Sequence, residues 1–457
     1  MSHRLSCLCN LELQIAGDSS LALAMVLSSI NTQLPQLRSL TLTARHSWIG
    51  AQAVWEQLGE ATQLTELAIR FHKTVDVGGQ VKDLAPLSSL SGLQQLKFRL
   101  INNAEQLQLD GVEASDAGFL SQLTSLTELC GDFVQKPGML ENIGSCTDLQ
   151  ELALTGDILV QPSSSDWQVL GSLTSLTQLL VSRGMLRDQD TQPFHSALER
   201  LTSLQAVTTG YWTQGAVPIL AALTKLIYVG GAWAAEDRVW DGDAAYTCER
   251  VAKVVWGEDN ASAPWSAFPN LLSVNLAGPM TAASWVEMVK YCPKVKQIIH
   301  CVDPLPNARP NMPAFTRTAT VPESVAALKG LARLTDLVHL CYCVSHKLEI
   351  VALAAAMQRV TGLKVLGVAL RAHPLLDWGC LLPLCQLKSV VLADFTVRVP
   401  LPSKHEAQML LYAFAHASDV TLAVGAADVA VVEEAVQDSR DMGLALPGNV
   451  TVVPVPE

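Results

Sequence analysis

The chain has 457 residues, of which 49% are hydrophobic and only 16% are charged, against about 25% charged residues in a typical domain. Its formal net charge of −12 argues against nucleic acid or an anionic membrane as the main partner, because both require basic patches. No apolar run reaches the roughly 18 residues of a spanning helix, so we expect no membrane insertion. The 11 scattered cysteines favour thiols in a reducing, cytoplasmic setting over a disulfide framework.

A leucine-rich phrase of the form LxxLxxLxL recurs along the chain. The clearest copies read LTSLTEL from Leu123 and LTSLTQL from Leu173. With the looser copies included, the pattern predicts about fifteen units, most of them 22 to 33 residues apart. The copies start at Leu5, Leu34, Ala61, Leu90, Leu123, Cys146, Leu173, Leu201, Leu223, Phe268, Cys292, Leu331, Val360 and Leu384, and a degraded copy surrounds Val420–Leu422.

The phrase has the spacing of a short β-strand that follows a tight turn. Its last two anchors are two residues apart, so they point to the same side of a strand. One strand cannot bury its apolar side alone, whereas stacked units form a parallel sheet with a continuous core. We therefore predict an α/β fold in which residues 1–457 form one repeat array.

Segments between the phrases often have the apolar spacing of an amphipathic helix. Near the C-terminus, Gly443 is placed to end the last of these helices, and the run VTVVPV from Val450 is expected to form a final strand. The predicted stripes are Trp285, Met288, Val289 and Cys292; Leu353, Met357 and Val360; Ala407, Leu410, Leu411 and Phe414; and Val429, Val432 and Val436.

Two interruptions break the spacing. An insertion at about 232–267 carries Trp233, Trp240, Trp256 and Trp265. It is interpreted either as a small core that packs on the flank of the array or as an exposed binding loop, since Trp is common at interface hot spots. A proline-rich interruption at about 302–322 is expected to be a surface connector or hinge, with a docking peptide as the alternative.

The phrases resemble those of the leucine-rich-repeat family over nearly the whole chain, and the steps of 27 to 29 residues are similar to its ribonuclease-inhibitor-like class. This resemblance implies a curved solenoid with the parallel sheet inside and helices and loops on the convex side. The chain departs from the family at one position. The family usually has Asn or Cys three residues after the last strand anchor, where this chain has Ala16, Arg45, His72, Ile101, Val134 and Asp157.

Motifs for catalysis or for a cofactor are not found. The sequence contains no phosphate-binding glycine loop, zinc-protease motif, nucleophile elbow or calcium loop. Cys7 with Cys9, and Cys341 with Cys343, are pairs that share a strand face, and His339 and His346 lie near the second pair. Two thiolates do not complete a zinc site, so we expect these cysteines to be small apolar core residues; a metal site formed by the second pair with the two histidines is the alternative. No enzyme, cofactor or metal is predicted.

The outward positions of the predicted strands indicate where a partner binds. The early strands present a mixed polar surface: Asn10, Glu12, Gln14, Ser39, Thr41, Thr43, Glu66, Arg70, Gln95, Lys97, Arg99, Glu128, Asp132, Glu151 and Thr155. In the middle of the array, Tyr211, Trp212, Tyr228 and Trp233 are predicted to form an aromatic patch that binds a partner. The alternative is that these rings only seal the tryptophan-bearing insertion onto the array.

Function is predicted mainly from the fold. A solenoid presents a long surface, which suits a non-enzymatic protein-interaction scaffold in the cytoplasm. One alternative is a substrate-recognition subunit of a ubiquitin ligase, whose relatives add an F-box helical module that the residues before Leu5 are too few to supply. The other is a cytoskeletal or axonemal structural component, which would place the protein at the cytoskeleton or cilium.

Overall fold

The computed structural model describes most of the chain and resolves it into two compact units. Unit 1 comprises Met1–Tyr211 with Ala222–Leu226, and unit 2 comprises Trp212–Ala221 with Ile227–Glu457. Within them the structure describes residues 7–15, 19–45, 51–72, 84–101, 117–131, 140–154, 163–181, 191–233, 248, 250–256, 263–276, 282–300, 325, 328–344, 346–370, 383–384, 387–397 and 404–454. The Pro-rich segment at 302–322 lies outside the described residues.

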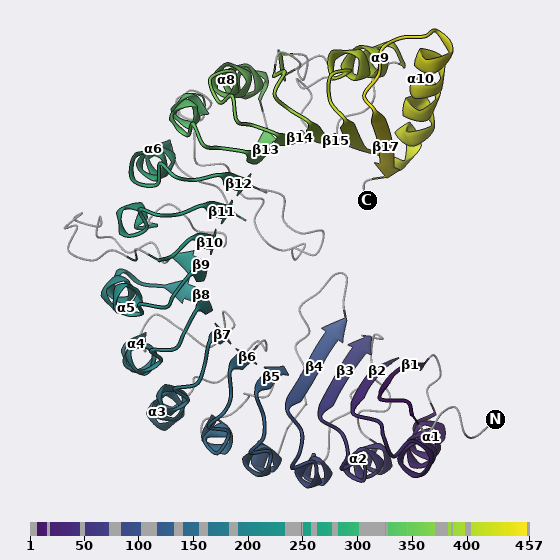
Figure 1. Ribbon diagram of the computed structural model, residues 1–457, viewed down its shortest axis with the longest axis vertical. Coiled ribbons are helices and arrows are strands. Elements are labelled where there is room, and N and C mark those ends of the chain that lie inside the picture. Colours follow the sequence, from purple (N-terminus) through teal and green to yellow (C-terminus); the bar gives the residue numbers. More distant parts are fainter. Residues whose placement is uncertain are drawn as a thin grey trace. The chain divides into compact units, whose positions relative to one another are not determined.

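In unit 1, successive strands are parallel and lie side by side in chain order (Figure 1). Their registers align the third anchor of each phrase, so that Leu11 pairs with Leu40 and Leu40 with Leu67. The strands are β1 (Asn10–Ile15), β2 (Ser39–Arg45), β3 (Glu66–His72), β4 (Gln95–Ile101), β5 (Glu128–Gly131), β6 (Glu151–Leu154), β7 (Gln178–Val181) and β8 (Ala206–Trp212).

Unit 2 repeats this arrangement, again with every described pairing parallel. The last strand, β17, contains the run from Val450 that was predicted as a strand. The strands are β9 (Tyr228–Trp233), β10 (Lys253–Trp256), β11 (Ser273–Leu276), β12 (Gln297–His300), β13 (His339–Val344), β14 (Val365–Leu370), β15 (Leu392–Val397), β16 (Asp419–Val424) and β17 (Asn449–Pro454).

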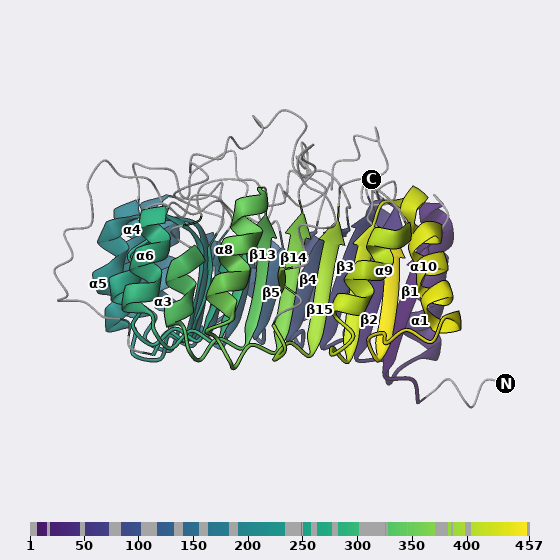
Figure 2. The ribbon, with the colours of Figure 1, turned by 90° about the horizontal axis from the view of Figure 1, so that it is seen from above.

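Helices cover one face of the sheet in each unit (Figures 1 and 2). The α-helices are α1 (Ser20–Gln33), α2 (Gln52–Gly59), α3 (Ser164–Ser172), α4 (Thr191–Arg200), α5 (Val217–Ala222), α6 (Ala282–Tyr291), α8 (Lys347–Met357), α9 (Lys404–Ala413) and α10 (Val429–Asp441). Short 3-10 helices span Ala85–Ser89, Ala117–Gln122, Leu140–Ile143, Gln214–Ala216, Trp265–Ala267, Leu331–Arg333 and Ala426–Asp428. Among the described residues, no helix is both long and apolar enough to cross a membrane.

Burial confirms the predicted helical stripes, except that Val429 at the start of α10 is only partly buried. Trp285 and Met288 of α6 are 3% and 0% exposed, and Leu410 and Leu411 of α9 are equally enclosed. The last predicted helix is α10, and Gly443 follows it with φ +68, a left-handed conformation that glycine adopts without steric cost. The α/β repeat pattern predicted from apolar spacing is therefore present in the described residues of both units.

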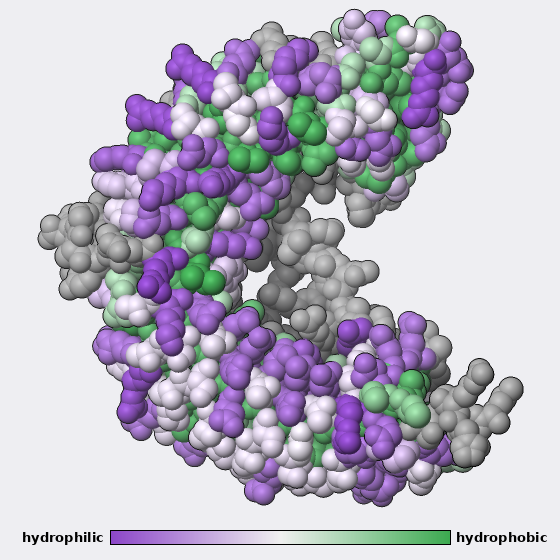
Figure 3. Space-filling view, viewed as in Figure 1, coloured by the Kyte–Doolittle hydropathy of each residue, from purple (hydrophilic) through white to green (hydrophobic). Residues whose placement is uncertain are grey.

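The core lies between the sheet and the helices of each unit. The middle anchors of successive phrases, among them Leu64, Leu93 and Leu126, are 0% exposed. Each fully buried leucine contributes about 1.5–3 kcal/mol relative to an exposed one, so the stack of anchors is a main stabilising term. In the space-filling view, hydrophilic and weakly polar residues dominate the visible surface of unit 1, and the hydrophobic areas are small and separated (Figure 3).

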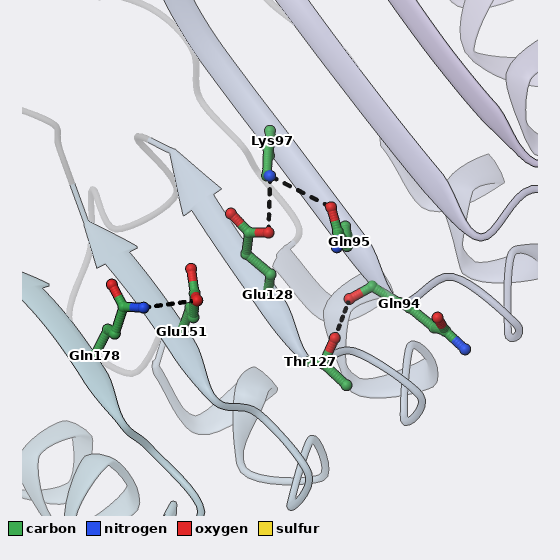
Figure 4. Close-up of polar contacts among 7 residues, drawn as sticks. All are labelled: Gln94, Gln95, Lys97, Thr127, Glu128, Glu151 and Gln178. Atoms are coloured by element: carbon green, nitrogen blue, oxygen red, sulfur yellow. Dashed lines mark hydrogen bonds and ion pairs between the residues drawn. The ribbon is translucent and has the colours of Figure 1, made fainter. Parts of the chain in front are cut away.

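A hydrogen-bond ladder explains the second threonine of the LTSLTEL phrase. The carbonyl oxygen of Gln94 accepts the backbone N–H of Thr127 at 2.8 Å, that of Glu128 at 3.0 Å and the Thr127 hydroxyl at 3.2 Å (Figure 4). Equivalent hydroxyl bonds, to a carbonyl of the preceding repeat, come from Thr65, Thr177 and Ser418. The turn before each of these strands is thus bonded to its neighbour by backbone and side chain together.

The ladder predicts a small, local loss of stability in Thr127→Val. Valine keeps the branched shape but removes the hydroxyl, and the Gln94 carbonyl keeps its two N–H donors, so we expect a loss of about 0.5–1 kcal/mol. The measurement is the midpoint of urea unfolding followed by circular dichroism. Thr124→Val, at an exposed position of the same phrase, serves as the control and should change little. Equal losses in the two variants would show that the hydroxyl bond contributes nothing.

The segment predicted as an insertion contributes a further strand. β10 pairs with β9 on one side and β11 on the other, with Val254 beside Val229 and Val274. The anchor positions of this copy hold Cys248, Val251, Val254 and Trp256, all buried. Because these residues are not leucines, the copy does not stand out in the sequence. At this point the array continues rather than being interrupted.

Two copies of the phrase are displaced by three residues from the predicted frame. In β13 the inward residues are Leu340 and Tyr342, and in β15 they are Ala393 and Phe395, each at most 3% exposed. Leu392, predicted as the last inward anchor of its copy, is 42% exposed. Both copies have one additional apolar residue at three-residue spacing, so the pattern fits two frames, and the backbone pairing with β12 and β14 selects one of them.

Candidate functional site: the exposed face of the strands

The first residue of each strand in unit 1 lies in one row across the exposed face of the sheet. Because the registers carry no offset, neighbouring members of the row are separated only by the strand spacing of about 4.8 Å. The row consists of Asn10, Ser39, Glu66, Gln95, Glu128, Glu151, Gln178 and Ala206. The positions from Asn10 to Glu151 were predicted to face outward, and none of the eight is buried in the structure.

Side chains of this row bind one another across strands (Figure 4). Lys97, at the next outward position of β4, places Nζ 2.7 Å from Glu128 Oε2 and 3.3 Å from Gln95 Oε1. Two strands further on, Gln178 Nε2 donates to Glu151 Oε1 at 2.8 Å. These contacts hold the carboxylates of Glu128 and Glu151 in fixed positions, which lowers the entropy that a partner would have to remove on binding.

A second ion pair crosses β2. Arg70 Nη1 of β3 lies 3.1 Å from Glu12 Oε1 of β1, and both side chains remain largely exposed. The Arg70 side chain therefore passes over the strand between them, where Thr43 pairs with Arg70 in the register. This explains why Thr43, predicted to be exposed, is only 7% exposed. The side chain of Arg99, and Asp132 and Thr155 as whole residues, lie outside the described residues.

The charge of this face is acidic among the described side chains. Four carboxylates share it with two cations, and both cations, Arg70 and Lys97, are engaged in the ion pairs just described. Glu66 lies exposed between these two pairs. The four carboxylates are Glu12, Glu66, Glu128 and Glu151.

The predicted aromatic patch is not assembled as expected. Trp212 is 0% exposed, and its Nε1–H donates to the carbonyl oxygen of Gly230 at 2.8 Å. Gly230 has no side chain to keep the indole away from the β9 backbone, so the ring packs against that strand instead of facing solvent. Trp212 therefore offers no surface to a partner, which corrects the prediction made from strand alternation.

The other three residues of the predicted patch differ from Trp212 in burial or in how far the structure describes them. Tyr228 is half-buried, and Lys253 Nζ lies 5.7 Å from the centre of its ring, within cation–π range. Tyr211 and Trp233 belong to β8 and β9, but their side chains lie outside the described residues. Of the four aromatic residues, Tyr228 is the one with a described, partly exposed ring.

The tryptophans of the predicted insertion are mainly core residues where they are described. Trp256 and Trp265 are 0% and 1% exposed, and their rings meet edge to face at 6.3 Å. Trp265 also donates from Nε1 to Ser284 Oγ at 2.8 Å. These two rings belong to the main core of unit 2, neither to a separate flank core nor to an exposed loop. Trp240 lies outside the described residues.

The described cysteines differ in burial. Cys146, Cys248 and Cys292 are buried apolar residues, as predicted for structural cysteines, and burial raises the pKa of Cys248 and of Cys292 to about 12. Cys7 and Cys9 are exposed, which corrects the prediction that they lie in the core. They precede the first residue of β1 and so lie outside its inward-facing stripe.

A polar chain of side chains crosses the exposed face of unit 2. Ser273 Oγ donates to Gln297 Oε1 at 2.9 Å, and Gln297 Nε2 lies 2.9 Å from His339 Nδ1. The other ring nitrogen of His339 lies 3.2 Å from Cys341 Sγ. Cys341 was predicted to be a core residue but is only partly buried, on the outward side of β13.

His346 is directed away from this chain of contacts. It is the N-cap of α8, where its Nδ1 accepts the backbone N–H of Leu348 at 3.2 Å. Among the described residues, no group of three or more His, Cys, Asp or Glu side chains is placed to hold a metal ion.

The exposed strand faces are thus the part of the described structure that is best suited to recognition. Compared with models of known protein families and with curated proteins, the sequence matches none, so the function has to be argued from these faces themselves.

Proposed function

We propose that the chain is a leucine-rich-repeat protein that acts as a non-enzymatic scaffold and binds a protein partner through the exposed strand face of unit 1. The observation that carries this proposal is the row of polar side chains from Asn10 to Gln178, which runs across seven parallel strands and in which neighbouring side chains hold Glu128 and Glu151 in place. Repeats that present equivalent positions side by side form a long binding surface.

The partner chemistry follows from charge. Among the described side chains of this face, Arg70 and Lys97 are already paired, so these side chains present an acidic surface on which Glu66 and Glu151 are the carboxylates without a cation in the described contacts. A protein surface or segment rich in Lys and Arg complements it, and the net charge of −12 attracts such a partner over longer range. No feature of the described residues favours a ubiquitin-ligase or axonemal role over this one.

The proposal predicts that reversing charge on this face removes the partner. In Glu66→Lys/Glu151→Lys, a basic partner meets two new like charges, and we expect its affinity to fall at least about tenfold, which corresponds to about 1.4 kcal/mol. The full chain is immobilised, the partner is captured from native extract with cross-linking, and the cross-linked peptides locate the contact. Capture should also weaken as salt is added.

The matched control makes the same charge change elsewhere. Glu56→Lys/Glu199→Lys places two lysines on exposed positions of α2 and α4, on the helix-covered side of the sheet. The control should capture the same proteins as the unmodified chain. Capture that is unchanged in the strand-face variant, or lost equally in the control, would overturn the proposed surface.

A further inference from the structure

A thiol and an imidazole meet on the exposed face of unit 2. His339 and Cys341 occupy two successive outward positions of β13, and His339 Nε2 lies 3.2 Å from Cys341 Sγ. Both residues are only partly buried, on the outward side of β13. An imidazole N–H within hydrogen-bond reach of a cysteine sulfur can stabilise the thiolate, which is the nucleophilic form.

The imidazole is oriented by a third and a fourth side chain. Gln297, which pairs with His339 in the register of β12 and β13, lies with Nε2 2.9 Å from His339 Nδ1. Ser273 donates to the Gln297 Oε1, which places the amide nitrogen towards the ring. The amide N–H therefore donates to Nδ1, so the ring carries its proton on Nε2, the nitrogen that faces Sγ.

The surroundings favour this neutral form of the ring. Burial lowers the pKa of His339, so the imidazole is uncharged at neutral pH. Among the described side chains of the flanking strands at this register, none is charged: β12 presents Gln297 and Ile299, and β14 presents Val365 and Gly367. The Nε2–H group is thus the donor that meets the sulfur, and such a donor stabilises a thiolate more than a thiol.

A glycine on the neighbouring strand makes room for the sulfur of Cys341. Gly367 of β14 pairs with Cys341, and a Cβ built on Gly367 would lie 2.6 Å from Cys341 Sγ. Any larger residue at this position would displace the sulfur or cover it. Cys248 and Cys292, by contrast, are enclosed in the core, and burial raises their pKa to about 12, which holds them in the unreactive thiol form.

We propose that Cys341 is a peroxide-sensitive thiol that hydrogen peroxide converts to a sulfenic acid, with His339 and Gln297 as positioning residues. The thiolate sulfur attacks one oxygen of hydrogen peroxide, so that an S–O bond forms as the O–O bond breaks. The departing hydroxide takes up the proton that the thiol released on ionisation and becomes water. The sulfur loses two electrons and the peroxide gains them, which gives a reversible modification.

The first test compares two cysteines of the same full-length chain. The chain is treated with limiting hydrogen peroxide, sulfenic acid is trapped with dimedone, and each cysteine is quantified by mass spectrometry. Exposed Cys9 is the internal control. We expect Cys341 to be trapped about threefold faster at pH 7, because a gain in thiolate is partly offset by lower intrinsic nucleophilicity. Equal or slower trapping at Cys341 would overturn the proposal.

The second test uses the pH profile of alkylation by iodoacetamide. The midpoint for Cys341 should lie about one pH unit below that for Cys9 and should rise towards it in His339→Leu, since that variant lacks the N–H donor. Gly367→Ala should slow alkylation of Cys341 alone. An unchanged midpoint in a folded His339→Leu protein would rule out the role of the imidazole. Should that variant fail to fold, the comparison of Cys341 with Cys9 in the unaltered chain still decides the proposal.

Discussion

Trp212→Ala is expected to destabilise the protein by about 3–5 kcal/mol, the range observed when a large aromatic side chain is removed from a core. The indole of Trp212 is 0% exposed and donates a hydrogen bond to the backbone of β9, so its loss leaves both a cavity and the Gly230 carbonyl without that donor. The loss should appear as a lower midpoint in thermal and urea unfolding and as faster amide hydrogen exchange in β9.

Tyr228→Ala is the matched control for this prediction. Tyr228 is half-buried and contacts Lys253 through its ring face, an interaction worth about 0.5–1 kcal/mol at an exposed site. Its removal should therefore cost much less than the removal of Trp212. If Trp212→Ala lowers stability by less than 1 kcal/mol, or no more than Tyr228→Ala does, the buried placement of the indole is wrong.

Asp166→Ala is expected to cost about 2–4 kcal/mol, because it leaves the buried N–H of Leu140 and two part-buried donors of Ser163 without this acceptor. Asp166 is 0% exposed at the start of α3. One carboxylate oxygen accepts the Ser163 N–H at 2.8 Å and the Ser163 hydroxyl at 2.7 Å, which closes the capping box of the helix. The other accepts the N–H of Leu140 at 2.8 Å and so joins α3 to the 3-10 helix of the preceding repeat.

Hydrogen exchange at the Leu140 amide measures this link between α3 and the preceding 3-10 helix directly. Its amide should exchange faster in Asp166→Ala, in parallel with a lower unfolding midpoint. Asp148→Ala, which removes an exposed carboxylate from the neighbouring phrase, should change stability by at most about 0.5 kcal/mol. Unchanged exchange at Leu140 would mean that the carboxylate does not link the two repeats.

Much of the fold follows from the sequence because the repeated anchors encode both spacing and direction. Each of the fifteen phrases was expected to end in a strand, and a strand is present at the end of each of them. The strand around Val254 was not predicted, because Val and Trp replace leucine at its anchor positions, although its inward-facing residues have the same spacing. The frames of β13 and β15 could not be chosen from apolar spacing alone, because the apolar residues of these copies permit two frames that only backbone pairing distinguishes.

The sites were less predictable than the fold. The polar row of unit 1 follows from strand alternation, so Glu66, Gln95 and Glu128 could be placed on it directly. Trp212 is buried with a hydrogen bond to a glycine of another strand, and the alternation of inward and outward residues along one strand does not predict such a contact. The contact of Gln297 with His339 joins residues on either side of the longest step in unit 2, so no local pattern indicates that they meet.

The strand register stays the same although the number of residues between successive strands varies. Within unit 2, the step from Val254 to Val274 is 20 residues and the step from Ile298 to Leu340 is 42 residues, yet both end in the same alignment. The difference in length falls between the end of one strand and the next phrase, and in a parallel sheet these strand ends share one edge. Segments can therefore lengthen or shorten at that edge without changing the alignment of the strands, so this edge can accept insertions that the strands themselves cannot.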